Sequence, residues 1–200
     1  MTLPEHAICS VMLAQFGVQQ RFGWRGTLVV ALAGISPDFD TVAKLFGDEH
    51  FWTLHHALGH NVFALVLLAA VVSGLGRWVL GLRPWGYLFF WCAVAAAAHA
   101  VTDCLYWFAV KPLWPLNDWA IKWEILEYLD LIVLAMWLTA AICLWKWPQR
   151  GRLIATVTLS LFTSYVLLRF ATPPPTGVWK FVTGGWMYDI PEGTPGFGWW

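Results

Sequence analysis

The sequence predicts an all-α membrane protein, a polytopic bundle of helices, and three features of its composition carry that prediction. Of the 200 residues, 59% are hydrophobic and only 12% are charged. The mean hydropathy is +0.60. The 16 tryptophans are typical of the aromatic belts that membrane proteins place at both interfaces. The net charge is zero, so no basic surface for nucleic acid is expected.

Four apolar stretches are long enough to cross a bilayer as helices, since about 20 residues are needed. They cover residues 57–76, 85–110, 125–145 and 153–170. Two shorter apolar pieces, at 4–20 and 27–35, predict a helical hairpin that packs on the bundle or partly enters the membrane. We therefore expect one membrane-embedded helical domain over 1–170 and an irregular aromatic tail over 171–200.

The basic residues indicate an orientation if the chain crosses the membrane at each segment in turn. With the N-terminus outside, the inward loops hold no Asp or Glu but contain Arg21, Arg25, Arg77, Arg83, Lys146, Arg150 and Arg152. The outward loops contain Lys44, Lys111, Lys122, Arg169 and Lys180. Short cytoplasmic loops are enriched in Lys and Arg. The acidic, histidine-rich side is therefore predicted to face away from the cytoplasm.

Residues of the types that bind metals lie in or beside the apolar stretches. They are His6, Asp38, Asp40, His50, His55, His56, His60, His99, Asp103 and Asp118. Ionisable side chains are costly in a bilayer, so a cluster of them indicates a functional site. In the alternating topology, the locations of His6, Asp38, His60 and His99 all fall on one side of the membrane.

The local spacing supports the same interpretation. His56 and His60 are four residues apart, as are His99 and Asp103, so each pair projects from one face of a helix. Asp103 is expected about 10 Å inside the end of the 85–110 span. A buried carboxylate there needs compensation, which a metal or a metal-bound histidine provides.

A set of histidines and carboxylates favours zinc, with manganese or iron as rivals. Six or seven ligands are too many for one tetrahedral ion, so two ions bridged by a carboxylate are expected. Such a pair generates hydroxide at neutral pH and stabilises the oxygens of a phosphoester. Other polar residues have ordinary alternatives: His50 and Asp118 as loop residues, one of His55 and His56 as an orienting or interfacial group, and Glu127 and Asp130 as charges at a helix start.

The order of these motifs resembles a known family. The chain carries an early His6, then Ser36-Pro37-Asp38-Phe39-Asp40, then His55-His56-Ala57-Leu58-Gly59-His60-Asn61, then His99-Ala100-Val101-Thr102-Asp103, then Leu113-Trp114-Pro115-Leu116. This order resembles the YdjM-like family of membrane-bound metal-dependent hydrolases, whose pattern includes LPDxD, HRGxTHS and HxxxD. The chain departs from that pattern at Ser36, His56, Gly59 and Asn61.

The YdjM-like family is distantly similar to the zinc-dependent phospholipase C and P1 nuclease group. The resemblance implies zinc ligation by His6, Asp38, His60, His99 and Asp103. It also implies Asp40 and His55 as further ligands or as the catalytic base, and a bacterial inner (plasma) membrane location. A later HxxxE element of the soluble enzymes is missing.

The sequence thus predicts a membrane-embedded hydrolase that cleaves a lipid phosphoester with a metal-activated water. Two alternatives stay open. One is an amide hydrolase similar to membrane zinc ceramidases, which the His56 to His60 spacing also fits. The other is a protein with a structural metal and no catalysis. A transporter is disfavoured, because the inner halves of the spans are nearly bare of acids and histidines.

Overall fold

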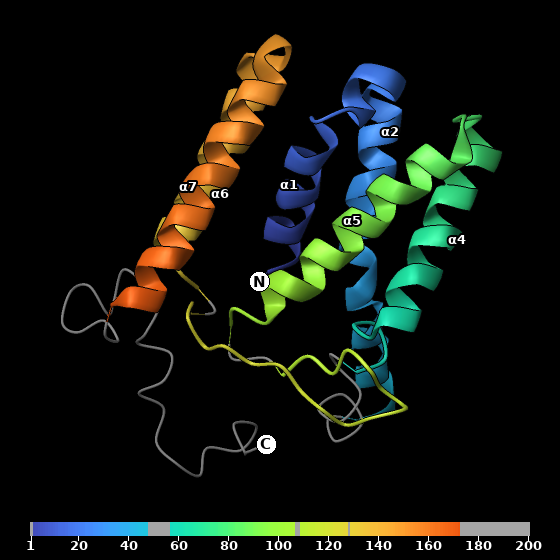
Figure 1. The fold of residues 1–200 in the computed structure, drawn as a ribbon. Helices are drawn as coiled ribbons and strands as arrows, with labels where there is room; N and C mark the ends of the chain where they lie inside the picture. The colour runs from blue at the N-terminus through green and yellow to red at the C-terminus, as the bar shows by residue number, and fades with distance from the viewer. Residues whose placement is uncertain (1, 48–56, 107–108, 128, 173–200) are drawn as a thin grey trace.

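A computed structural model describes residues 2–47, 57–106, 109–127 and 129–172. Within them the fold is helical, as the sequence predicts (Figure 1). The helices are α1 (Leu3–Ala14), α2 (Val18–Ile35), α4 (Val62–Leu80), α5 (Trp85–Asp103), α6 (Leu131–Lys146) and α7 (Gly151–Ala171). Two 3-10 helices are η1 (Ser36–Phe46) and η2 (Pro148–Arg150).

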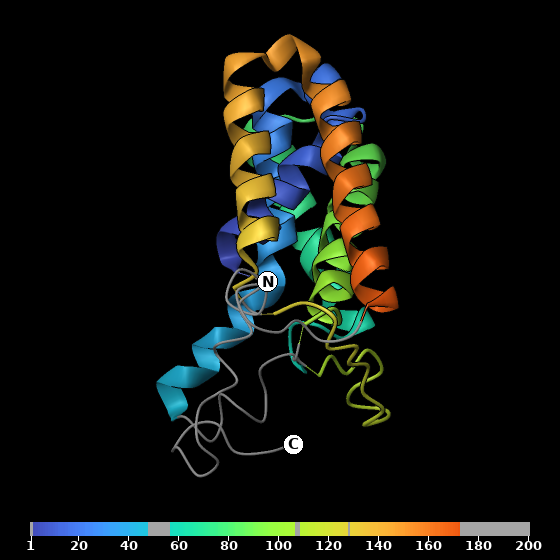
Figure 2. The ribbon, with the colours of Figure 1, turned by 90° about the vertical axis from the view of Figure 1, so that its left-hand side faces the viewer.

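The helices form two groups that meet along α1. Helix α2 packs against α1, α4 and α5, and a core of small and branched side chains fills this group. Helices α6 and α7 pack on each other and on α1, around Met12, Trp137 and Phe162. Figures 1 and 2 show the α6–α7 hairpin standing beside the other helices. The fold therefore leaves long apolar faces on its outside, such as that of α4.

Three helical segments are long and apolar enough to cross a membrane: Val62–Leu80, Trp85–Asp103 and Pro148–Ala171. Helix α6 is apolar but has only 16 residues, so the structure gives three candidate spans where the sequence predicted four. The predicted hairpin before them is confirmed as α1 and α2. The turn between these two helices lies at residues 15–17, N-terminal to the predicted turn between residues 20 and 27.

The predicted span 153–170 lies within α7, whereas the other three begin too early or end too late because apolar residues continue beyond the helices. Helix α4 begins after Asn61, whose side-chain oxygen accepts the Ala64 N–H, and α6 begins after Asp130, which accepts the Ile132 and Val133 N–H groups. Helix α5 ends at Asp103, seven residues before the predicted end. Residues 104–106 form a turn, and an antiparallel bridge joins Val110 and Ile121. Of the predicted tail over 171–200, the structure describes only residues 171 and 172, and the rest lies outside the described residues.

Candidate metal site

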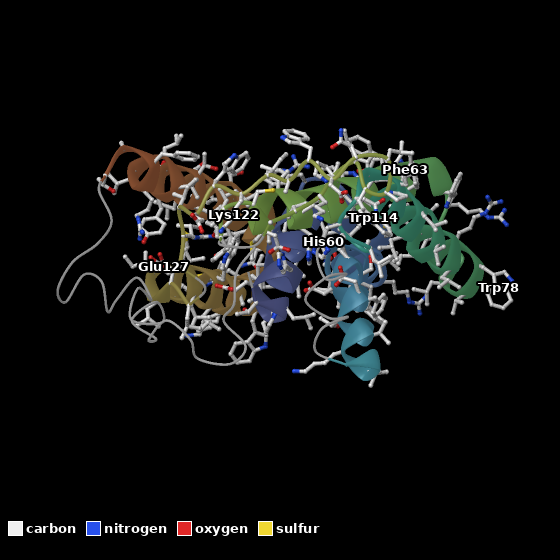
Figure 3. All side chains as sticks on the ribbon, turned by 90° about the horizontal axis from the view of Figure 1, so that it is seen from below. His60, Phe63, Trp78, Trp114, Lys122 and Glu127 are labelled. Carbon is white, nitrogen blue, oxygen red and sulfur yellow. The ribbon has the colours of Figure 1, made fainter. Side chains whose placement is uncertain are left out.

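The predicted site residues come from four elements that end at the same side of the bundle. His6 lies in α1, Asp38 and Asp40 in η1, His60 just before α4, and Asp103 at the end of α5 with His99 one turn earlier. Figure 3 looks at the molecule from this end and shows His60 near the middle of the view. The convergence that the alternating topology predicts is therefore confirmed. The expected depth of Asp103 is wrong, because α5 stops at that residue.

The turn before α4 holds His60 in place. The Asn61 side chain accepts from Ala64 and donates to the carbonyl oxygens of Ala57 and Leu58, which closes the turn around His60. Gly59 passes so close to η1 that an added Cβ would lie 1.9 Å from the Pro37 carbonyl oxygen. The local sequence therefore fixes the backbone on both sides of this histidine.

The two nitrogens of His60 have different partners. Nδ1 lies 3.0 Å from Asp40 Oδ2, which also accepts the Gly59 N–H at 3.3 Å. Since a carboxylate accepts, Nδ1 is the protonated nitrogen and donates. Nε2 then points to Asp103 Oδ2 at 3.1 Å and to His99 Nε2 at 3.0 Å. Asp38 Oδ1 lies 3.8 Å from the same nitrogen.

His99 is oriented in the same way by a backbone group. Its Nδ1 lies 2.6 Å from the carbonyl oxygen of Gly34 and donates to it. Its Nε2 faces Asp103 Oδ2 at 3.1 Å and Asp38 Oδ1 at 3.4 Å. His99 and Asp103 share one face of α5 because they are four residues apart.

This arrangement of two histidines and two carboxylates favours a cation. With both Nδ1 atoms donating elsewhere, the Nε2 lone pairs of His60 and His99 face each other at 3.0 Å and Asp103 Oδ2 at 3.1 Å. Asp38 Oδ1 lies 3.8 Å from the first of these nitrogens and 3.4 Å from the second. Burial lowers the pKa of His60, but its bonds to Asp103 and Asp40 outweigh that effect and raise it to about 9. A proton can serve as that cation, and a divalent ion that bound these ligands would displace it. The donor set therefore fits a metal ion.

Four of the seven predicted ligands form the group that can hold an ion: Asp38, His60, His99 and Asp103, with ligand atoms within 4.8 Å of one another. His6 adjoins this group. Its ring stacks on His99 with centroids 3.6 Å apart. Its buried Nε2 lies 3.1 Å from Asp103 Oδ1 but makes no hydrogen bond with any residue that the structure describes. The two oxygens of Asp103 thus face different histidines.

The remaining candidates are not brought into the group or are not described. Asp40 lies on the far side of the His60 ring, against Nδ1, so its ligand role stays a prediction. His55, predicted as ligand or base, lies outside the described residues, as do His50 and His56. Asp118 is exposed and pairs with Lys111 at 3.2 Å, as its loop alternative predicts.

Asp130 is a structural residue at the start of α6, as its helix-start alternative predicts. It accepts the N–H groups of Ile132 and Val133. It also accepts the Tyr165 hydroxyl at 2.7 Å, which joins α6 to α7. Asn61, directly before an apolar run, is an N-cap signal that the sequence analysis did not use. The role of the Gly34 carbonyl had no sequence signal, because any backbone oxygen can accept.

The chain is an integral membrane protein whose apolar helices bring together, at one end of the bundle, a His/Asp group that could hold a metal ion. Its sequence matches the model of the YdjM inner membrane protein family over residues 1–173. It therefore belongs to that family, as its motifs predicted. No curated protein and no solved structure is significantly similar to the chain.

Proposed function

We propose that the protein is a membrane-embedded, metal-dependent hydrolase that cleaves a phosphoester of a membrane lipid. The observation that carries the proposal is the approach of the His60 and His99 Nε2 atoms to 3.0 Å, together with Asp38 and Asp103. Two imidazoles and two carboxylates suit zinc and related divalent ions. Such an ion, when bound, lowers the pKa of water to about 7 and polarises a phosphoryl oxygen.

The chain's own groups have distinct parts in this proposal. Asp38, His60, His99 and Asp103 would hold the ion, and Asp40 fixes the ring of His60 through Nδ1. Partners of this kind set the tautomer and raise the basicity of a ligating histidine. Asp40 and His55 remain the predicted bases. Because Asp103 Oδ1 faces His6 while Oδ2 faces His60 and His99, His6 and Asp103 would be the residues to hold a second ion.

The position of the site supports a lipid headgroup as the substrate. Asp103 is the last residue of α5 and His60 lies two residues before α4, so the site is level with the helix ends. Asp38 is the accessible member, with a side chain 14% exposed against 2% or less for His60, His99 and Asp103. Substrate and water therefore approach from the η1 side. The basic turns lie at the opposite end, which supports a site facing away from the cytoplasm.

The burial of the other three ligands favours a second candidate, a structural ion that ties η1 and the turn before α4 to α5. The two candidates differ in accessibility, since a catalytic ion keeps a position open to water. A structural ion raises thermal stability without supporting hydrolysis.

The test combines metal content with product analysis. Purified wild type is compared with Asp103→Asn and with Asp118→Asn, which changes an exposed carboxylate outside the site. We expect wild type and Asp118→Asn to hold zinc and to release the phosphorylated headgroup from phospholipid vesicles, and Asp103→Asn to do neither. Release of fatty acid from ceramide with no phosphoester cleavage would establish the amidase instead. Bound zinc with no hydrolysis of either lipid would support the second candidate, a structural ion.

A further inference from the structure

An apolar groove of about 680 Å³ runs between α6 and α7. Its walls come from these two helices and from the turn that joins them, and no described residue of α1, α2, α4 or α5 lines it. Since α1 packs on this hairpin from the other side, the groove opens on the outside of the bundle. Figure 2 shows α6 and α7 side by side at the front of the molecule.

The groove lies along the part of the protein that the membrane surrounds. It extends from Ile132 and Tyr165 near the site end to Trp147 and Arg150 at the other end. Residues 132–147 cover about 22 Å at the rise of a helix, which is more than one leaflet of a hydrocarbon core about 30 Å thick. The bilayer core offers no water to fill such a groove, so an apolar chain must cover its walls.

The end of the groove at the α6–α7 turn is cationic. Arg150 lines it, and Lys146 and Arg152 lie within four residues of it. No Asp or Glu occurs anywhere between residues 131 and 172. Arg150 also makes no ion pair with any residue in the described part of the chain. Its charge is therefore available to an anion from outside the protein.

We propose that this groove binds an anionic phospholipid of the leaflet opposite the metal site. Its phosphate lies at Arg150 and Arg152, and an acyl chain lies between α6 and α7. Basic positions between membrane helices suit anionic headgroups. The small side chains of Thr139 and Ala140 line the middle of the groove and leave room there for the acyl chain. The lipid completes the packing of a hairpin whose outer face the described residues leave uncovered.

The test measures lipid binding by native mass spectrometry of detergent-purified protein titrated with phosphatidylglycerol or phosphatidylcholine. Wild type is expected to retain phosphatidylglycerol and to prefer it over phosphatidylcholine. The double variant Arg150→Gln/Arg152→Gln is expected to bind phosphatidylglycerol about 30-fold more weakly, or about fivefold for each charge. The matched control, Arg77→Gln/Arg83→Gln, removes two charges from the same end of the bundle, one in the last turn of α4 and one in the turn before α5, and should bind like wild type.

A second variant tests the groove itself. Thr139→Trp fills its middle without changing charge, and should abolish retention of the lipid while the helical content by circular dichroism stays that of wild type. Equal weakening in the two double variants would overturn the proposal, because it would indicate general attraction to a basic surface. Equal affinity for the two lipids would also overturn it, as would undiminished binding to Thr139→Trp. A dimer that Thr139→Trp dissociates would assign the groove to a second copy of the chain instead.

Discussion

Replacing Asp40 by Asn separates two roles for this carboxylate, a metal ligand as the sequence predicts or a group that orients His60. Asp40 Oδ2 lies 3.0 Å from His60 Nδ1 and 3.3 Å from the Gly59 nitrogen. It is not one of the four residues whose ligand atoms converge. Asparagine keeps the size of the side chain and one acceptor oxygen, and removes the charge. The geometry favours the orienting role.

The magnitude follows from that role. A bond to a charged acceptor is roughly twice as strong as one to a neutral acceptor, so Asn holds the His60 ring less firmly. Loss of such an outer partner costs about 10–100-fold in metal affinity, or about 1.4–2.7 kcal/mol. The metal stoichiometry should stay that of wild type. Asp40→Ala should weaken metal binding further, because it leaves the buried Nδ1–H of His60 without this acceptor. That loss carries a penalty of about 1–3 kcal/mol.

The assay is a competition titration of zinc against a chromophoric chelator, with wild type, Asp40→Asn and Asp103→Asn in the same detergent. We expect Asp40→Asn to bind the wild-type number of ions with weakened affinity, and Asp103→Asn to lose bound zinc. If Asp40→Asn loses zinc as completely as Asp103→Asn, Asp40 is itself a ligand and the orienting role is refuted. An unchanged affinity would show that this hydrogen bond does not support the site.

Three further changes test the packing and the ion. Gly59→Ala should lose metal although it removes no ligand atom, because the new Cβ would lie 1.9 Å from the Pro37 carbonyl oxygen. The control is Gly74→Ala, whose Cβ meets nothing within 4 Å. Equal metal content in the two variants would contradict the prediction. Tyr165→Phe removes the 2.7 Å bond to Asp130 and should lower the stability by about 1–3 kcal/mol in thermal unfolding. Unchanged zinc content in that variant would agree with a purely structural role. Chelation should lower the melting temperature of wild type, and zinc restored at 100 times Kd should return about 2.7 kcal/mol; a melting temperature insensitive to chelator would argue against the site.

Much of the site follows from helix order and spacing alone. Short turns make successive helices antiparallel, so residues at alternate ends of the helices share one side of the bundle. His60 and His99 converge for this reason, although 39 residues separate them. The spacing of four residues then places Asp103 beside His99 on α5. These two regularities predicted the location of the cluster without knowledge of side-chain contacts.

The sequence could not predict that Asp38 and Asp40 have different roles. Residues two apart in a 3-10 helix differ in direction by about 240°, and the sequence does not show that η1 is a 3-10 helix. In the structure the two carboxylates approach opposite nitrogens of one imidazole, with Asp38 nearer Nε2 and Asp40 at Nδ1. Likewise, the stacking of His6 on His99 depends on how α1 meets α5, which no local pattern specifies.

The predicted helix boundaries were wrong for a different reason. Hydropathy measures whether a residue tolerates the membrane, and it does not report where a helix stops. Residues 104–110 are mostly apolar, so the predicted span continued past Asp103, where the chain turns. This error mattered chemically, because it placed Asp103 about 10 Å too deep. A carboxylate at the end of a helix is reached by a lipid headgroup, whereas one buried deep in the hydrocarbon is not.

The charge pattern separates the two ends of the protein, so substitutions at one end should not change binding at the other. In the described residues every Asp and Glu lies at the site end, and the turns at the other end carry arginine and lysine. Helix α5, which joins the two ends, is about 28 Å long at 1.5 Å per residue. Substitutions so far apart without shared partners are expected to add. Arg150→Gln should therefore leave zinc affinity unchanged both in wild type and in Asp40→Asn. If it altered zinc affinity in either, occupancy of the lipid groove and the geometry of the metal group would be coupled through α1, which carries His6 and packs on α6 and α7.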